Sequence, residues 1–413
     1  MFLDYLAIGS GAILKVLSLY FVIVILFIFR KKKRTPHFPA RTRFACIIAA
    51  RNEEAVIGNL VRSLKDQDYP AELSEIYVIP NNCTDNTEKA AMEAGADIIH
   101  VSGPIRFKGD ALKQAFRQLR KKSDIDAFLI FDADNIADPG YFRAMNDAFL
   151  SGAEVTKSRI DSRNPYSSWV SGCYGLYYTI FNRFFNEARS RAGLSPKLIG
   201  TGLGIKRDTL YSMGGWNTVT IAEDTEFNAD AILADLDIRW VPEAVTYDET
   251  PDSFRVSLRQ RLRWVKGIMD VGKERIPDLY YDMKSAPKPA RHFDFAMILM
   301  LPYIQAVSLI PAILLYISAA IRGTLLITLG ISALGLILSY AGLAVFGLML
   351  SIFSPFETKR MAKAILLFPV FTFSWMPLCL ISMFRKEITW SQIRHTGAAS
   401  TANIRYYPVP VRD

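Results

Sequence analysis

Two aspartates, Asp132 and Asp134, directly follow the apolar run 128–131. A short run of this kind predicts a buried strand, so both carboxylates would lie at a strand end. Two carboxylates in that position can share a hard cation such as Mg²⁺ or Mn²⁺, which would also hold diphosphate oxygens. A solvated acidic turn is the alternative, and the preceding strand favours the cation site.

A lysine and a second acidic pair could also do chemistry. Lys108 precedes a predicted helix over 110–122, where an ammonium and free backbone N–H groups can bind a diphosphate together. An ordinary surface lysine is the alternative. Glu223 and Asp224 form the acidic pair, and a carboxylate beside a bound substrate can act as a general base. Acidic residues also favour the first turn of a helix, so a structural role is the alternative there.

Gln260, Arg263 and Trp264 are the most specific signal in the sequence. Their spacing of i, i+3 and i+4 puts all three on one face of a helix. That face would offer an amide, a guanidinium fork for phosphate and an indole that can stack on a sugar or a base. A basic amphipathic helix resting on a membrane would show the same pattern, and both interpretations can hold together.

Strand-like and helix-like segments alternate around these motifs. Strands are expected over 44–50, 75–79, 96–101 and 126–131, and helices over 53–65, 84–94 and 110–122. This order predicts an α/β fold with a parallel sheet and helices on both faces. Ligands of such sheets bind beyond the carboxyl ends of the strands, which is where the acidic motifs fall.

The composition indicates a membrane protein. The chain has 413 residues, of which 51% are hydrophobic, and a formal net charge of +9. Much of the basic excess lies beside apolar segments, which favours an anionic membrane surface over nucleic acid as the partner. The four cysteines form no CxxC pair, which argues against a zinc site and against a disulfide framework.

Hydropathy divides the chain into five parts. These are a transmembrane helix (12–29), a mixed-polarity domain (40–270), an interfacial segment (271–292), a membrane domain (293–384) and a basic tail (385–413). The basic cluster Arg30–Arg34 places the end of the first helix in the cytoplasm, so the domain that follows would be cytoplasmic and the protein integral to the cell membrane.

The membrane domain contains two full spans, 293–321 and 325–352, followed by a third stretch, 362–384. This third stretch is long enough to cross, but the basic residues after it favour a cytoplasmic tail. Pro369 and Pro377 each remove a helical hydrogen bond, so we expect a re-entrant segment rather than a crossing one.

In their order along the chain, the motifs resemble the family 2 glycosyltransferases. The resemblance is to the processive, membrane-integrated branch that includes cellulose, chitin, hyaluronan and poly-N-acetylglucosamine synthases. It covers about residues 40–270 and rests on Arg51-Asn52-Glu53-Glu54, Asp132-x-Asp134, Glu223-Asp224 and Gln260-x-x-Arg263-Trp264. It implies a GT-A (Rossmann-like) α/β domain, a UDP-sugar donor, a divalent metal and inversion. The implied activity is transfer to the non-reducing end of a growing polysaccharide, coupled to its export.

The resemblance also implies a role for each motif residue. Asp134 would hold the metal, and Asp224 would be the base, with Glu223 as the competing candidate. The donor would be bound by Ala50, Asn52, Glu53, Asn81, Lys108, Asp132, Gln260, Arg263 and Trp264. The acceptor would contact Gly200, Thr201, Gly202 and Trp264. Lys386, Trp390 and His395 resemble a tail motif of the branch.

One position departs from the family pattern and leaves alternatives open. Asn81 stands where an aspartate usually binds the uracil or ribose, so the negative charge is absent, although an amide can still hydrogen-bond the uracil imide, and the choice of nucleobase stays open. A non-processive synthase that glycosylates a membrane lipid, such as diacylglycerol or a polyprenyl phosphate, would use the same donor site. A transporter or receptor with a nucleotide-sensing domain is disfavoured, because the membrane stretches carry few ionisable groups.

Overall fold

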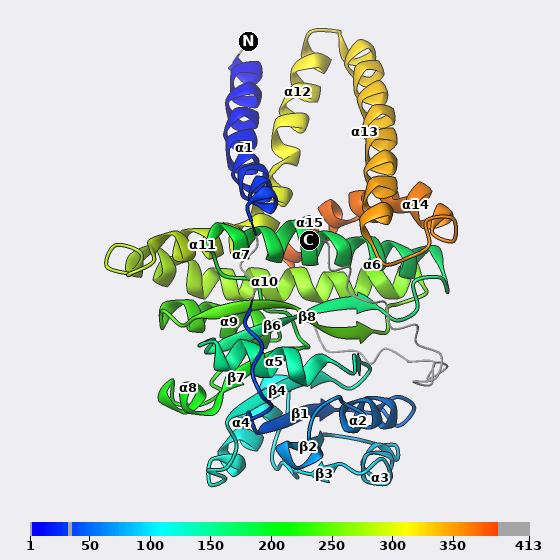
Figure 1. Ribbon diagram of the computed structural model, residues 1–413. Coiled ribbons are helices and arrows are strands. Elements are labelled where there is room, and N and C mark those ends of the chain that lie inside the picture. Colours follow the sequence, from blue (N-terminus) through cyan, green and yellow to red (C-terminus); the bar gives the residue numbers. More distant parts are fainter. Residues whose placement is uncertain (1, 32–34, 387–413) are drawn as a thin grey trace.

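The computed structural model describes residues 2–31 and 35–386, which form a sheet-based domain beneath a group of apolar helices (Figure 1). The sheet has eight strands in the order β3-β2-β1-β4-β7-β6-β8-β5. Its strands are β1 (Phe44–Ala50), β2 (Ser74–Pro80), β3 (Asp97–Ile98), β4 (Ala127–Asp132), β5 (Ile136–Ala137), β6 (Val155–Ser162), β7 (Leu203–Lys206) and β8 (Ile238–Asp248).

The direction of the strands changes in the middle of the sheet. As predicted, β1 pairs in parallel with β2 and β4, and β2 pairs in parallel with β3. However, β7 runs antiparallel to both β4 and β6, and β6 pairs in parallel with β8. The prediction of a parallel sheet therefore holds for β1 to β4 and for the pairing of β6 with β8, and it fails at β7 and β5, which run antiparallel to their neighbours. The four residues of β7 carry no signal of strand direction, which is set by how the chain returns past the end of β4.

Helices cover both faces of this sheet, in agreement with the sequence. They are α2 (Ile57–Lys65), η2 (Ala71–Leu73), α3 (Thr87–Glu93), α4 (Lys108–Leu119), α5 (Tyr141–Leu150), α6 (Trp169–Thr179), the π-helix η3 (Ile180–Glu187), α7 (Ala188–Ala192), α8 (Arg207–Ser212), α9 (Glu223–Leu233) and α10 (Phe254–Asp282). The predicted boundary at residue 270 falls inside α10. The predicted helix over 53–65 begins only at Ile57, because residues 53–56 form a turn in which Glu53 O accepts from the amides of Val56 and Ile57.

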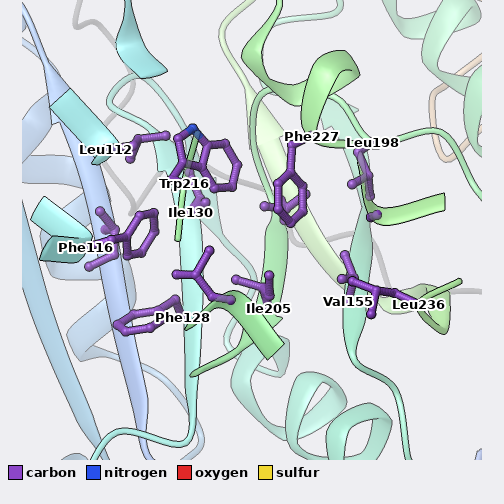
Figure 2. Close-up of a cluster of buried hydrophobic side chains, with 14 of the residues drawn as sticks. Leu112, Phe116, Phe128, Ile130, Val155, Leu198, Ile205, Trp216, Phe227 and Leu236 are labelled. Carbon is purple, nitrogen blue, oxygen red and sulfur yellow. The ribbon is translucent and has the colours of Figure 1, made fainter. Parts of the chain in front are cut away.

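One hydrophobic cluster brings α4 and α9 together on the same face of the sheet. Figure 2 shows Phe116 of α4, Phe128 of β4 and Phe227 of α9 in this cluster, with Trp216 between the helices. Trp216 stacks on Phe227 with ring centroids 4.4 Å apart, and Phe116 meets Phe128 edge-on at 4.9 Å. Burial of four aromatic rings fixes the relative position of the two helices, and therefore of the residues at their amino-terminal ends.

The remaining helices are strongly apolar. They are α1 (Phe2–Leu26), η1 (Phe27–Phe29), α11 (Pro289–Val307), α12 (Leu309–Ile321), α13 (Leu325–Phe353), α14 (Ala362–Phe373) and α15 (Trp375–Phe384). By length and composition, four stretches of the described chain could cross a membrane: Phe2–Phe29, Pro289–Ile321, Leu325–Phe353 and Ala362–Phe384.

Two of these four stretches are not single straight helices. In Figure 1, α1, α12 and α13 stand away from the sheet-based domain, whereas α11, α14 and α15 lie across it. The stretch from Pro289 to Ile321 divides at Ser308, and the stretch from Ala362 to Phe384 divides at Ser374. A helix lying across the domain buries one side on it and leaves the other exposed, as Phe368 and Leu366 of α14 show.

The amino-terminal helix is fastened to the rest of the molecule by polar contacts. Tyr20 of α1 donates to Asp294 Oδ1 of α11 at 2.7 Å, and Arg189 Nε of α7 donates to Asp294 Oδ2 at 3.0 Å. Arg191 donates to the carbonyl oxygens of Ile28 and Arg30 at 2.6 and 2.7 Å, at the carboxyl end of that helix. The three helices are therefore joined through a buried ion pair.

Candidate active site

The carboxyl end of β4 holds a cluster of charged side chains centred on Lys108. Its ammonium donates to Asp132 Oδ1 at 2.6 Å and to the carbonyl oxygen of Gly200 at 2.7 Å. Glu223 Oε1 lies 3.6 Å from the same nitrogen. One lysine at the start of α4 thus joins the end of β4, the start of α9 and the segment between η3 and β7.

A glycine allows this close approach. A Cβ on Gly109, the second residue of α4, would lie 2.6 Å from Thr218 Oγ1 in the segment that leads to α9. A larger residue there would push the starts of α4 and α9 apart, and Lys108 with them. The glycine beside the predicted lysine therefore has a packing role that its position in the sequence did not reveal.

The cluster has more negative than positive side chains, and their pKa values reflect this. Burial and the neighbouring Asp132 raise the pKa of Asp134 to about 7. Burial also raises the pKa of Glu223 to about 7, although Lys108 acts in the opposite direction. Burial, with Asp134 and Asp132, raises the pKa of Glu53 to about 9. Carboxylates that resist ionisation in this way would be stabilised in the charged form by a cation.

The residues at the end of β4 suit a hard divalent cation. Asp132 and Asp134 provide carboxylate oxygens, which Mg²⁺ and Mn²⁺ prefer. Within the described part of the chain, no group of three or more histidine, cysteine or acidic side chains is placed to hold a metal ion. Substrate phosphates and water would supply the other ligands, as is usual for Mg²⁺ in phosphate-binding sites.

Asp224 is oriented by backbone donors at the start of α9. Its Oδ2 accepts from the amide of Gly200 at 2.5 Å, and its Oδ1 accepts from the amide of Thr225 at 2.6 Å. Glu223 instead turns toward Lys108. The two adjacent carboxylates therefore have different partners: Glu223 is engaged in an ion pair, and Asp224 is held by neutral N–H groups at the wall of a cavity.

This cavity has a volume of about 560 Å³ and two chemically different ends. The charged cluster forms one end. The other end is formed mainly by apolar and aromatic side chains of α6, η3, α10, α11 and α15, including Tyr177, Phe181, Phe185, Ile268, Leu301 and Trp375. A charged ligand group and an apolar one can therefore bind in the same cavity.

The predicted face of α10 contributes to the same cavity. Gln260, Arg263 and Trp264 all line it. Tyr174 donates to Gln260 Oε1 at 3.0 Å, and the Tyr174 ring meets the Trp264 indole edge-on with centroids 6.1 Å apart. One buried tyrosine therefore sets the orientation of both the amide and the indole.

The structure brings most, but not all, of the sequence-predicted residues together. The cavity is lined by Glu53, Asn81, Lys108, Asp132, Asp134, Gly200, Thr201, Glu223, Asp224, Gln260, Arg263 and Trp264. Ala50, Asn52 and Gly202 are not part of its lining. Lys386 is the last described residue, and Trp390 and His395 lie outside the described residues.

The three residues outside the lining have local structural roles. Ala50 ends β1, and its carbonyl oxygen accepts from the backbone amide of Asn81 at 2.9 Å. Asn52 has a positive φ of 59°, and its side chain accepts from the amide of Thr84 at 2.7 Å. Gly202 has a φ of +67°, and a Cβ there would lie 1.8 Å from Ser158 Oγ. These residues shape the backbone beside the cavity.

Asn81 lines the cavity, but its amide is already engaged. It donates to the carbonyl oxygens of Ala50 and Ile79 at 3.0 and 3.3 Å, and it accepts from Arg51 Nε at 2.9 Å. Arg51 also lines the cavity and donates to Ile105 O at 3.0 Å. Asn81 therefore positions Arg51, a residue that the sequence motifs included without assigning it a role.

Two features of the cavity were missed by sequence reasoning. Lys197 lines it, in a segment with no recognisable motif. The aromatic residues Tyr177, Phe181 and Phe185 also line it, at a regular spacing of four. That spacing was the available signal, but it is also what an ordinary buried helix shows.

Comparison with known proteins agrees with this geometry. Residues 39–267 match the family model described as "Glycosyltransferase like family 2". The chain is 27% identical over 237 residues to the probable glycosyltransferase YdaM of Bacillus subtilis (strain 168), which covers 54% of this chain and 55% of that protein.

Two further relatives have more specific names. The chain is 25% identical over 278 residues to the beta-monoglucosyldiacylglycerol synthase of Nostoc sp., and the match covers 65% of this chain and 57% of that protein. It is also 25% identical over 228 residues to the poly-beta-1,6-N-acetyl-D-glucosamine synthase of Staphylococcus epidermidis, and this match covers 54% of this chain and 53% of that protein. The matches span little more than half the length of each of these relatives.

One solved structure resembles nearly the whole chain. It is the mannosyltransferase PcManGT from Pyrobaculum calidifontis in complex with GDP-Man and Mn²⁺, with a TM-score of 0.63 and 20% sequence identity. The match covers 93% of this chain and 100% of that one, so the common fold includes apolar helices as well as the sheet-based domain.

Proposed function

This chain belongs to the family 2 glycosyltransferases and has their GT-A fold, and on that premise we propose that it transfers a sugar from a UDP-sugar, with inversion, to an acceptor at a membrane surface. The observation that carries the proposal is the placement of Lys108, the Asp132 and Asp134 pair and Asp224 around one cavity. These residues supply the charges that the leaving diphosphate and the attacking acceptor require.

The donor diphosphate would bind at the charged end of the cavity. Lys108 and Arg263 line this region and offer positive charge, and the free N–H groups at the start of α4 add to it. Asp132 and Asp134 would hold Mg²⁺ or Mn²⁺, which when bound supplies further positive charge beside the diphosphate. Glu53 and Arg51 complete the wall on the side of β1.

The acceptor would be activated by Asp224. An acceptor hydroxyl oxygen attacks the anomeric carbon and gives its proton to the Asp224 carboxylate, while the bond to the diphosphate breaks and its electron pair leaves with the diphosphate. A single displacement of this kind inverts the anomeric configuration. The amides of Gly200 and Thr225 hold the carboxylate in position. Glu223 is the less suitable base, because it is paired with Lys108.

Two nucleobases, uracil and guanine, are candidates for the donor. Asn81 stands at the position of the usual family aspartate, and its amide is bonded to the protein. PcManGT, which shares the fold, was solved with GDP-Man. Both uridine and guanosine diphosphate sugars therefore have to be tested.

The relatives leave two classes of acceptor open, a polysaccharide and a membrane lipid. The sequence motifs favour polymer synthesis, which stays a prediction. The apolar end of the cavity favours a lipid, because it is walled by α11 and α15, which lie across the domain beside the upright helices (Figure 1). An apolar wall at this place suits an acyl or isoprenoid chain better than a hydrated polymer.

The arrangement of helices supports a position at the cytoplasmic face of the cell membrane. We propose that α1, α12 and α13 span the bilayer and that α11, α14 and α15 lie at its surface. Arg30 and the basic residues after it would then be cytoplasmic. Because α14 and α15 both lie across the sheet-based domain, whereas α12 stands upright (Figure 1), the stretch from Ala362 to Phe384 would not cross, and the tail would stay on the side of the sheet-based domain.

A donor and acceptor screen tests the proposed function. The protein purified in detergent would be incubated with UDP- and GDP-sugars, with Mg²⁺ or Mn²⁺, and with either a membrane lipid extract or oligosaccharides. Mass spectrometry would identify the glycosylated product, and its anomeric configuration would follow from NMR. We expect one nucleotide sugar to be consumed and its sugar to appear on an acceptor. If no nucleotide sugar is consumed with either metal, the proposal is wrong.

A further inference from the structure

Lys197 is a buried cation that the proposed sugar transfer does not yet use. Its side chain lines the cavity and the residue is only 9% exposed. Burial lowers the pKa of Lys197 to about 8. Its ammonium makes no hydrogen bond or ion pair with any of the described residues. A cation buried without a partner is costly, so a ligand that brings an anion to it would be stabilised.

The backbone around Lys197 is firmly held. Its amide donates to Asn186 Oδ1 at 2.9 Å, and its carbonyl oxygen accepts from Asn186 Nδ2 at 3.2 Å. The next residue, Leu198, belongs to the hydrophobic cluster of Figure 2, and its amide donates to Asn228 Oδ1 at 2.9 Å. The lysine is therefore presented from a fixed segment rather than from a loose loop.

Lys197 lies in the segment that connects the proposed base to η3: the amide of Gly200 donates to Asp224 Oδ2 at 2.5 Å, and the side chain of Asn186, next to Phe185, bonds to the backbone of Lys197. Two charges act on it in opposite directions: Asp224 raises its pKa, and Arg189 lowers it. Arg189 in turn stacks on the ring of Phe185, 3.6 Å from its centroid. Lys197 is therefore close enough to feel both the Asp224 carboxylate and the Arg189 guanidinium that covers Phe185.

From Phe185 a wall of stacked rings leads to the membrane-surface helices. Phe185 stacks on Phe181 with centroids 5.7 Å apart, and Phe181 stacks on Tyr177 at 6.5 Å. Tyr177 stacks on Trp375 of α15 at 5.7 Å. The first three rings are four residues apart along α6 and η3, and the wider turn of the π-helix keeps them nearly in line.

This aromatic wall suits an apolar chain. Its ring faces are turned toward one another, so they are partly unavailable for stacking on sugars. Leu301 and Pro302 of α11 also line this end of the cavity. The wall ends at α15, where Met376 and Leu380 are exposed as lipid-facing residues would be.

We propose that the acceptor is a phosphate-bearing membrane lipid, bound with its hydroxyl at Asp224, its phosphate at Lys197 and its chain along the aromatic wall. This inference rests on the proposed sugar transfer and specifies its acceptor. The hydroxyl oxygen forms the new bond to the anomeric carbon, its proton passes to Asp224, and the donor diphosphate leaves with the electron pair of the broken bond. A neutral diacylglycerol would leave the charge of Lys197 without a partner.

Two lipid sources share this chemistry and are separated by the experiment. One is a glycerophospholipid with a hydroxylated headgroup, represented by phosphatidylglycerol, and the other is a saccharide linked to a polyprenyl phosphate. Diacylglycerol and a soluble oligosaccharide serve as acceptors without phosphate. Each would be offered to the wild type, to Lys197→Met and to Lys197→Arg, with Lys121→Met as the control for loss of an exposed lysine.

We expect the wild type to use one of the two phosphate lipids in preference to both acceptors without phosphate. Lys197→Met should raise the acceptor KM at least about tenfold, which corresponds to about 1.4 kcal/mol, and leave the donor KM unchanged. Lys197→Arg should recover most of the loss, and Lys121→Met should match the wild type. Binding of the phosphate lipid without donor, measured by native mass spectrometry, should fall in the same proportion in Lys197→Met.

Other results would overturn the inference without touching the proposed sugar transfer. Equal use of diacylglycerol or an oligosaccharide by the wild type would show that phosphate is not required. Unchanged lipid binding in Lys197→Met, with a lower kcat for every acceptor, would show that the lysine acts on Asp224 instead. Only a wild type that consumes no nucleotide sugar at all would count against the proposed function itself.

Discussion

Replacing Lys108 by methionine is the sharpest test of the charged cluster. The substitution keeps a side chain of similar length and removes the ammonium that bonds to Asp132 at 2.6 Å and to Gly200 O at 2.7 Å. Glu223, 3.6 Å from the same ammonium, loses its cation as well. Two carboxylates then share the end of β4 with no positive charge between them.

The loss of folding stability expected in Lys108→Met follows from how deeply the ion pair is buried. Removing one partner of a fully buried ion pair costs about 3–5 kcal/mol. The side chains of Lys108 and Glu223 are 18% and 10% exposed, but that of Asp132 is 40% exposed, so solvent screens part of the loss. We therefore expect a destabilisation of about 2–3 kcal/mol. For a domain of this size, that lowers the apparent Tm by about 4–12 °C.

The stability lost in Lys108→Met should also depend on pH, because the pKa of the Glu223 carboxyl lies near neutrality. Burial raises its pKa to about 7, and Lys108 works against that rise. A carboxyl with a raised folded-state pKa favours the folded state at low pH, and this contribution is lost as the pH rises through about 7. Without Lys108 the pKa of Glu223 rises further, so the stability deficit of the variant should be constant below about pH 6 and should grow as the pH rises through about 7 and above it.

Thermal unfolding in detergent, without donor or metal, would measure this deficit across the pH range. Lys121→Met, which removes an exposed lysine just after the same helix, is the matched control and should unfold like the wild type. A Lys108→Met deficit that is the same at every pH, or that is absent at about pH 8, would refute the assignment of Lys108 as the shared partner of Asp132 and Glu223.

Three further substitutions separate the proposed roles within the cavity. Asp134→Asn should lower kcat by about 10²–10³-fold and raise the Mg²⁺ or Mn²⁺ concentration needed for activity, and full turnover in excess EDTA would contradict the metal site. Asp224→Asn should keep nucleotide binding, measured by calorimetry, and lower transfer by about 10²–10⁴-fold; loss of nucleotide binding would make it a donor ligand instead. Trp264→Ala should raise the acceptor KM more than the donor KM, and an equal rise in both would indicate that the indole only packs against Tyr174.

The parts of the fold that the sequence predicted well are those with a strong local pattern. The continuous apolar run of β1 predicted its bounds, Phe44–Ala50, because a strand buried on both faces leaves little choice of residue. The acidic residues after Phe131 were placed correctly because ligands of parallel sheets bind at the carboxyl ends of strands. Gln260, Arg263 and Trp264 were placed on one face of α10 because the spacing of residues along a helix alone determines which of them share a face.

The parts that could not be predicted depend on contacts between distant segments. Lys108 meets the carbonyl oxygen of Gly200 across 92 residues, and no local pattern encodes that distance. The hydropathy of 362–384 is the same whether the helix is straight or broken at Ser374. The contact next to the break comes from a distant segment, because Arg261 of α10 donates to Phe371 O at 3.0 Å. The engaged amide of Asn81 likewise depends on the end of the neighbouring strand β1.

The contact between Tyr20 and Asp294 has a consequence for how the protein is made. The two residues are 274 positions apart in the chain. At a synthesis rate of roughly 5–20 residues per second, Tyr20 waits roughly 15–55 s for its partner to leave the ribosome. Arg189 also has no carboxylate to pair with until Asp294 has been made, by which time the last sheet strand, β8, is already complete. We therefore expect α11 to dock between α1 and α7 only after the sheet is complete, and the nascent enzyme to stay inactive at least until then.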